Sequence, residues 1–254
     1  MPFTVSHVAF VLPLPERLRL PLCGLVVGAM APDLEYVVYG HPRRTISHSA
    51  LGIVTLDLVL ALTLLVGATL AAPGLGSLIP ARPRVLRERI GGWRAPLWPL
   101  PSLARLVAAI VVGAASHVVT DGFTHAGSFP ARHIPLLTSS TPIRGWTGAK
   151  VLQYGLSLIG ILVIARVFWR WLDDVGVRRS IAERWPPGRL WVMATAAGGI
   201  GLLATHDQLA RPGLGTLRDT LVLAFLGTAR TVLVIALVSG LVLHPKVRAA
   251  PRPL

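Results

Sequence analysis

Six long apolar stretches constrain the fold of this chain more than any other feature. A helix that crosses the hydrocarbon core of a bilayer needs about 20 residues, because it rises about 1.5 Å per residue. The stretches lie at residues 20–39, 50–72, 103–120, 151–172, 189–205 and 219–243. Hydrophobic residues make up 53% of the 254 residues and charged residues only 14%, which is too apolar for a soluble domain of this length. We therefore expect an all-α fold, a polytopic membrane bundle of about six spans that forms one domain over residues 1–254.

A shorter apolar piece, "FTVSHVAFVLPLP", precedes the first stretch and is interrupted by Pro13 and Pro15. It is too short to cross a bilayer. The sequence predicts a short N-terminal helix over residues 4–13 that turns at "LPERLR". Pro32, near the end of the first stretch, lacks a backbone N–H and predicts a local break in that helix.

The charge distribution predicts an orientation in the membrane. The chain has 25 Lys and Arg against 11 Asp and Glu, a net charge of +14. Under strict alternation of six spans, the arginine-rich loops 73–102 and 173–188 and the C-terminal tail fall on one side. By the positive-inside rule that side is the cytoplasm, and both termini are then cytoplasmic as well. We therefore expect a multi-pass protein of the cell membrane, whose basic residues face anionic lipid and not nucleic acid.

Ionisable residues interrupt the apolar stretches in three strings of the first half. The strings contain His7, then Asp33, Glu35, His41 and His48, and finally His117, Asp121 and His125. A charged side chain within a span costs a few kcal/mol or more unless it is paired. The predicted topology brings the second and third strings to a similar depth in the outer half of the membrane. Residues spaced by four share one face of a helix, and the three ionisable residues of the third string have this spacing. A polar site built mainly from residues 1–130 follows.

Three histidines and two aspartates without a thiolate are typical of a site for zinc or another borderline divalent metal, one or two ions. The candidate ligands are His7, Asp33, His48, His117 and Asp121. Cys23 is the only cysteine, which excludes a cysteine zinc cluster. The candidate catalytic residues are Glu35, His125 and Asp121, of which the first two would act as general base or acid. The alternative interpretation of each histidine is a packed core or interface residue.

The remaining ionisable residues received other interpretations. Asp57 is a separate carboxylate within the second stretch, nine residues after His48, which is the opposite face of a straight helix. It would be a structural or supporting partner. The ordinary loop or interface residues are His133, His206, Asp207 and His244.

Four strings carry a family resemblance. They are "MPFTVSHVAFVLPL", "GLVVGAMAPDLEYVVYG", "ISHSALG" and "SHVVTDGFTHAG", and they resemble the bacterial integral-membrane family known as domain-of-unknown-function 4184. Their pattern of an N-terminal His, a Pro-Asp, a His-Ser and a His-x3-Asp-x2-Thr also resembles the predicted membrane-bound metal-dependent hydrolases. The resemblance covers residues 1–130 and implies the same five metal ligands. Two departures from the hydrolase pattern are Glu35, in place of a second Asp, and "TISHS", where the histidine before His48 is lost or replaced by His41.

Two classes of function suit such a site. The first is a metal-dependent hydrolase that uses metal-activated water against an ester or phosphate of an amphiphilic, lipid-like substrate. A variant of this class uses the same His and Asp residues as acids and bases in a cyclase, isomerase or lyase. The second is a transporter of ions or small molecules, although the chain shows no inverted repeat. A purely structural membrane protein would leave Asp33 unexplained.

Overall fold

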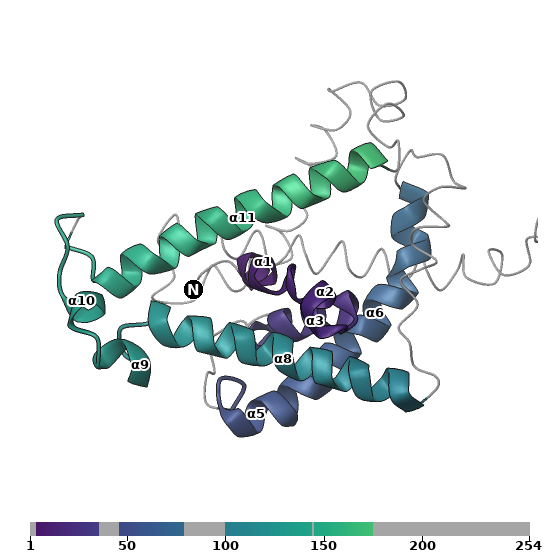
Figure 1. The fold of residues 1–254 in the computed structure, drawn as a ribbon, viewed down its shortest axis with the longest axis horizontal. Coiled ribbons are helices and arrows are strands. Elements are labelled where there is room, and N and C mark those ends of the chain that lie inside the picture. Colours follow the sequence, from purple (N-terminus) through teal and green to yellow (C-terminus); the bar gives the residue numbers. More distant parts are fainter. Residues whose placement is uncertain (1–3, 36–45, 79–99, 144, 175–254) are drawn as a thin grey trace, which may run out of the picture. The chain divides into compact units, whose positions relative to one another are not determined.

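The computed structural model describes residues 4–35, 46–78, 100–143 and 145–174. Every regular element assigned among these residues is a helix (Figure 1). The predicted all-α fold is confirmed for these residues. The chain divides into two compact units, Met1–Val66 with Ala95–Arg170 and Gly67–Arg94 with Trp171–Leu254. All candidate site residues that the structure describes lie in the first unit. The single domain stays a prediction.

Short helices form the N-terminal segment. The 3-10 helix η1 (Thr4–His7) and α1 (Val8–Val11) are followed by α2 (Leu14–Leu18). Pro13 lies at the break before α2, where a residue without an N–H costs little. Arg19 then ends α2 in the left-handed conformation, with φ of 54°. The predicted short helix is thus present as η1 and α1. The predicted turn at residues 14–19 is wrong, because Pro15 suits the first turn of a helix and residues 14–18 form α2, so that the chain breaks at Pro13 instead.

The next helix, α3 (Leu22–Met30), leads to the first aspartate of the site. Its end tightens into the 3-10 helix η2 (Ala31–Asp33). Pro32 lies within η2 and supplies no N–H to an α-helical ladder. The predicted local break is confirmed, and it leaves Asp33 buried at the end of the helix.

Close packing of α3 along α8 (Leu100–Thr124) positions the site. A side-chain carbon added to Gly28 would clash with the carbonyl oxygen of Ile110 and lie only 2.9 Å from its carbonyl carbon. One added to Gly113 would lie 2.8 Å from the backbone nitrogen of Ala29. Small residues at such positions allow two helix backbones to approach each other closely. The crossing therefore brings the end of α3 next to the C-terminal half of α8.

The predicted span 50–72 is not one continuous helix. The short helix α5 (Ala50–Val54) is capped by Ser49, and α6 (Leu56–Leu78) follows it. Between them Thr55 leaves the helical region, with φ of −119° and ψ of −88°. Its hydroxyl donates to the carbonyl four residues earlier at 2.7 Å, a local bond that competes with regular helix geometry.

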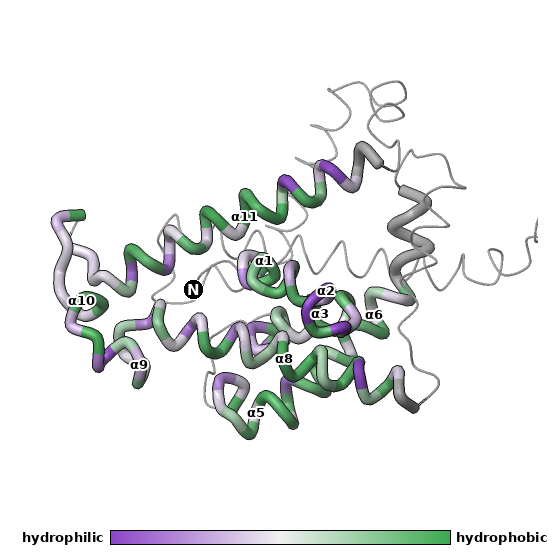
Figure 2. Tube along the Cα trace, viewed as in Figure 1, coloured by the Kyte–Doolittle hydropathy of each residue, from purple (hydrophilic) through white to green (hydrophobic). Residues whose placement is uncertain are grey.

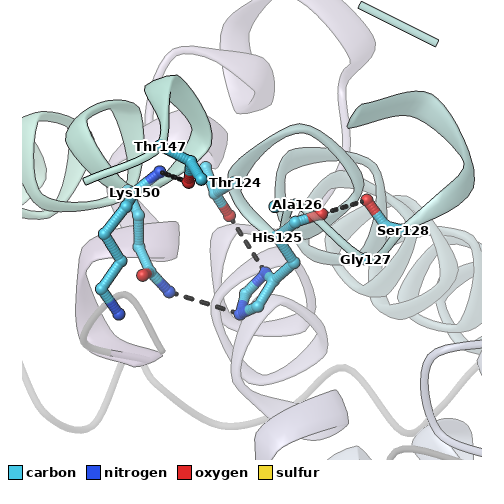
Figure 3. A pocket seen from close by; sticks show the side chains of 8 residues that line it. Thr124, His125, Ala126, Gly127, Ser128, Thr147 and Lys150 are labelled. Atoms are coloured by element: carbon cyan, nitrogen blue, oxygen red, sulfur yellow. Dashed lines mark hydrogen bonds between the residues drawn. The ribbon is translucent and has the colours of Figure 1, made fainter. Parts of the chain in front are cut away.

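The long helix α11 (Gly148–Asp174) follows two short helices, α9 (Phe129–Arg132) and α10 (Pro135–Thr138). It packs against the N-terminal segment, because a side-chain carbon on Gly160 would lie 2.6 Å from the carbonyl oxygen of Ser6. A cavity of about 620 Å³ lies where the end of α8 meets the start of α11 (Figure 3).

Two helices are long and apolar enough to cross a membrane, by length and composition alone: Ser102–Arg132 and Gly148–Trp171. Figure 2 shows long hydrophobic runs along both. These match the third and fourth predicted spans. Leu22–Asp33 and Leu56–Leu70 are apolar but shorter. Outside the described residues lie the last two predicted spans, the C-terminal tail and residues 175–188 of the predicted loop. The six spans and their orientation therefore stay predictions.

Candidate metal site

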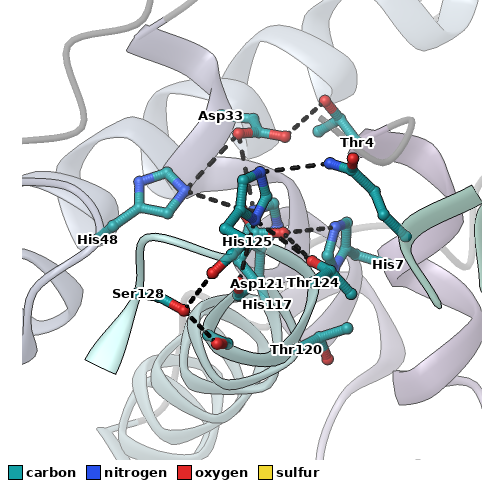
Figure 4. Close-up of polar contacts among 12 residues, drawn as sticks. Thr4, His7, Asp33, His48, His117, Thr120, Asp121, Thr124, His125 and Ser128 are labelled. Carbon is teal, nitrogen blue, oxygen red and sulfur yellow. Dashed lines mark hydrogen bonds and ion pairs between the residues drawn. The ribbon is translucent and has the colours of Figure 1, made fainter. Parts of the chain in front are cut away.

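Four ionisable residues from three parts of the chain converge in the first unit (Figure 4). They are Asp33 at the end of η2, His48 in the turn before α5, and His117 and Asp121 on α8. Each offers one ligand atom, and these atoms all lie within 4.8 Å of one another. His117 is completely buried, and the two aspartates are each 3% exposed. The spacing of His117 and Asp121 places both on the same helix face, as predicted.

Asp121 lies at the centre of this group. Its Oδ2 is 3.4 Å from Nε2 of His48 and 3.8 Å from Nε2 of His117. Its Oδ1 is 3.4 Å from Nε2 of His7. On the other side, Oδ1 of Asp33 is 3.8 Å from Nε2 of His48 and 3.7 Å from Nε2 of His117. The Nε2 atoms of His48 and His117 therefore each face two carboxylates.

Contacts on the far side of each ring define which nitrogen carries the proton. Nδ1 of His117 is 2.7 Å from the carbonyl oxygen of Ala29, which can only accept, so Nδ1 is the donor. Nδ1 of His48 is 3.0 Å from Oγ of Ser47, which itself donates to Glu35 at 3.0 Å. His48 Nδ1 is then also the donor. When both rings are neutral, the Nε2 lone pair of each faces the carboxylates, which is the orientation of a metal-ligating histidine.

Hydroxyl groups hold the two carboxylates in the same way. Thr4 of η1 donates to Oδ2 of Asp33 at 2.8 Å. Thr124, one turn after Asp121, donates to its Oδ1 at 3.5 Å. Oδ1 of Asp33 and Oδ2 of Asp121 are thus the oxygens that face the histidines. Such outer contacts typically fix the ligands of a metal site.

The atoms that face one another in this group fit a divalent metal ion. Within the part of the chain that the structure describes, no hydrogen bond reaches Asp33 Oδ1 or the Nε2 atoms of His7, His48 and His117, although all four are buried. A buried polar atom without a partner costs about 1–3 kcal/mol. Neutral imidazole lone pairs that face carboxylate oxygens also repel them. A divalent cation would satisfy these atoms and balance the two aspartates.

His7 lies beside the group of four and reaches it through Asp121. Its ring stacks on the ring of His117, with centroids 3.9 Å apart and an interplanar angle of 18°. Burial, together with the neighbouring His117, lowers the pKa of His7 from 6.5 to about 4. His7 is therefore neutral at pH 7, the form in which histidine binds metal. Its role as a fifth ligand stays a prediction.

The two predicted proton carriers, His125 and Glu35, connect to different members of the group. His125 follows the last residue of α8, and its Nδ1 is 3.0 Å from the carbonyl oxygen and 3.7 Å from Oδ2 of Asp121. It therefore continues the face of His117 and Asp121. Glu35 is 8% exposed and connects to His48 through Ser47. The acid and base roles of both stay predictions.

The other ionisable residues are placed as follows. Asp57 is completely buried, and neither of its carboxylate oxygens has a hydrogen-bond partner among the described residues. Its predicted position opposite His48 on a straight helix is wrong, because Thr55 interrupts the helix. His133 is exposed and its ring lies 4.3 Å from that of Phe129, as expected of an ordinary residue. Outside the described residues lie His41, His206, Asp207 and His244.

Sequence reasoning did not assign a role to the groups behind the candidate ligands. Thr4 and Ser47 precede His7 and His48 by three residues and one residue, so their proximity could have suggested supporting roles. Thr124 stands in the quoted family pattern, but no function was attached to it. The carbonyl of Ala29 left no signal, since every residue has one.

The described part of the chain is thus an all-helical assembly with a buried His/Asp group that could hold a metal. The chain belongs to the family described as "Domain of unknown function (DUF4184)", which matches residues 1–245. No curated protein matches the chain. No solved structure matches it either. The predicted family is therefore confirmed, whereas its membrane character and the resemblance to membrane-bound hydrolases stay predictions.

Proposed function

We propose that this protein is a membrane-embedded, metal-dependent hydrolase that acts on an ester or phosphate of an amphiphilic, lipid-like substrate. One observation carries the proposal: the buried Nε2 atoms of His48 and His117 face two aspartates and have no hydrogen-bond partner among the described residues. A divalent cation between the groups would satisfy these nitrogen atoms and balance the two carboxylates. Zinc suits a set of imidazole and carboxylate ligands without a thiolate.

The residues of the group would divide the work of hydrolysis. A bound divalent ion would supply a Lewis acid that activates water. The ligands of that ion would be Asp33, His48, His117 and Asp121. Thr4 supports Asp33 by a hydrogen bond, and Ser47 supports His48.

Protons would move through the histidine nearest the cavity. The side chain of His125 is 24% exposed, which is more than that of any of the four candidate ligands in the group. His125 also lines the cavity. It is therefore suited to exchange protons with a substrate. Glu35 would act over a longer path, because Ser47 stands between it and His48.

A metal-free alternative uses the same pocket. If both Nε2 atoms carry protons, the imidazolium groups would pair with Asp33 and Asp121 and satisfy the same atoms. The protein would then be an acid–base enzyme, such as a cyclase, isomerase or lyase. Metal content separates these two cases.

The decisive experiment is elemental analysis of the full chain purified in detergent. We expect one zinc ion or another divalent ion per chain, and less than a tenth of this in an Asp33→Ala variant. A His133→Ala variant removes an exposed histidine outside the group and should keep the wild-type content. A wild-type protein that folds and contains no divalent metal, or an Asp33→Ala variant that retains it, would contradict the proposed site.

Turnover provides the second measurement. Hydrolysis of p-nitrophenyl butyrate and p-nitrophenyl phosphate can be followed in detergent before and after chelation. We expect chelation to abolish turnover and zinc to restore it. Turnover that persists in metal-free protein would favour the acid–base alternative.

A further inference from the structure

The cavity at the end of α8 differs in charge from the adjacent group of aspartates. It has a volume of about 620 Å³ and is lined by Thr124, His125, Ala126, Gly127, Ser128, Thr147, Lys150 and Gln153. None of these residues is acidic, and Lys150 supplies a positive charge (Figure 3). The cavity therefore attracts anions, whereas the two aspartates beside it attract cations.

Lys150 is an unusual residue in this chain. The sequence contains 25 Lys and Arg, of which only Lys150 and Lys246 are lysines. Lys150 is half-buried and forms no ion pair with any described residue. Its position in the first turn of α11 is electrostatically unfavourable for a cation, because that end of a helix is positive. Nζ lies 5.1 Å from the ring centroid of Tyr154, a contact that holds the ammonium in place. The Lys150 ammonium therefore has an aromatic partner but no acidic one among the described residues.

The cavity and the candidate metal site share His125. On the cavity side, Nε2 of His125 lies 3.3 Å from Nε2 of Gln153, a residue of α11 that is only 2% exposed. On the other side, Nδ1 of His125 lies 3.7 Å from Oδ2 of Asp121. A molecule in the cavity would thus be separated from the aspartate by one imidazole ring.

We propose that this cavity binds a phosphate group, with Lys150 as its positive partner. A lysine ammonium is a compact charge that commonly binds phosphate. The phosphate would be the head group of the amphiphilic substrate, and His125 would lie between it and the metal. This assignment of the substrate class rests on the proposed function, whereas phosphate binding in the cavity can be tested without it.

The two lysines allow a direct measurement of binding. Reductive methylation of the full chain with labelled formaldehyde places NMR signals on Lys150, on Lys246 and on the N-terminal amine, and Lys150→Arg and Lys246→Arg variants assign the two lysines. The probes are inorganic phosphate, dihexanoyl phosphatidic acid and the uncharged dihexanoyl glycerol. We expect both anions to shift the Lys150 signal, the lipid at the lower concentration, and the uncharged lipid to leave it unchanged. Inorganic phosphate acting as well as the lipid would contradict a lipid head-group site.

Matched variants measure the contribution of the charge. In calorimetric titrations with dihexanoyl phosphatidic acid, Lys150→Gln should weaken binding about tenfold or more, the usual effect of losing a hydrogen bond to a charged group. Lys246→Gln makes the same chemical change elsewhere and should bind like the wild type. Equal effects of the two variants, or no shift of the Lys150 signal with either anion, would overturn the proposal.

A repeat after chelation separates this inference from the proposed function. Because Lys150 is no candidate metal ligand, its signal should still shift in chelated protein. A shift that disappears on chelation would mean that phosphate binds the metal and not the cavity, which overturns the inference and leaves the hydrolase intact. A persistent shift in a protein that never contains metal would keep the phosphate site and refute the metal-dependent hydrolase.

Discussion

The two long helices α8 and α11 are alike in apolar character but differ in what they bury. Both are long and apolar enough to cross a bilayer. In α8, 33% of the most apolar segment is buried, whereas in α11 only 17% of the corresponding segment is buried. α8 carries Gly113, His117 and Asp121 on the side that meets other elements. α11 leaves large apolar side chains exposed, with Leu158 and Leu162 at 61% and 59%. Hydropathy therefore identifies both helices but does not show which one carries a site.

The difference arises from close packing. On α8, Gly113 lies against the backbone of α3, and His117 binds the carbonyl of Ala29 on that helix. On α11, Gly160 approaches the backbone of Ser6 closely, but a side-chain carbon on Gly155 would meet nothing within 4 Å among the described residues. If α11 faces lipid there, its exposed apolar side chains contact hydrocarbon and need no protein partner. The predictions below test this contrast.

The largest expected effect is that of His117→Ala in α8. Removing a support of a metal ligand typically costs 10–100-fold in affinity, so removing a ligand should cost at least about 100-fold and abolish turnover. Ser157→Ala in α11 is the matched control, since this serine is also buried but donates its hydrogen bond to the carbonyl of Gln153 in its own helix. Metal titration with a competing chelator measures both. A His117→Ala variant with wild-type affinity would remove α8 from the site.

Glu35→Gln should separate metal binding from proton transfer. Glutamine can still accept the hydrogen bond of Ser47, so His48 keeps its orientation and the metal stays bound. The carboxylate as a proton carrier is lost, and we expect the rate to fall about 100-fold. Glu16→Gln, at an exposed position of α2, is the control. A full rate in Glu35→Gln would assign Glu35 a role in holding Ser47 alone.

Two glycine substitutions test the packing of the two helices directly. Gly113→Ala should force α3 and α8 apart and destabilise the protein by about 2 kcal/mol. Gly155→Ala in α11 has room for the added carbon and should leave stability unchanged or raise it by up to about 1 kcal/mol. Thermal unfolding in one detergent compares the variants. Equal midpoints would show that the α3–α8 crossing tolerates a wider spacing.

The sequence predicted the parts of the site that depend on local spacing. The apolar stretches 103–120 and 151–172 correspond to α8 and α11, because hydropathy alone defines long helices. The pairing of His117 with Asp121 follows from helix geometry. Pro32 likewise produced the expected break, since its missing N–H acts within its own turn.

Features that depend on distant contacts could not be predicted. The interruption at Thr55 accompanies a close approach of Gly52 to the backbone of Ile46, which hydropathy does not encode. The contact of Thr4 with Asp33 joins residues 29 positions apart. Lys150 lies far from the three polar strings, and only the approach of α11 to the end of α8 places it beside His125.

Gln153→Met should test whether α11 contributes to catalysis. Methionine has a similar volume and suits a buried position, but it cannot bond to the ring of His125. We expect metal content to stay at the wild-type value and the rate to fall about tenfold, less than for His125→Ala, because the ring remains but loses its orientation. Steady-state kinetics and elemental analysis on the same preparation provide the two readouts. An unchanged rate would restrict the contribution of α11 to the cavity wall.

The smallest expected effect is that of Leu162→Ala on the exposed side of α11. This side chain is 59% exposed among the described residues, so we expect it to contact hydrocarbon in the membrane. Lipid tails are as apolar as leucine, and the substitution should change the free energy of unfolding by less than about 0.5 kcal/mol. Leu106→Ala provides the contrast, because Leu106 is completely buried in α8 and its truncation should cost about 2–5 kcal/mol. Thermal unfolding in the same detergent compares the two. If Leu162→Ala costs as much as Leu106→Ala, another part of the chain covers this face of α11, and the contrast between the two helices is one of partners and not of lipid exposure.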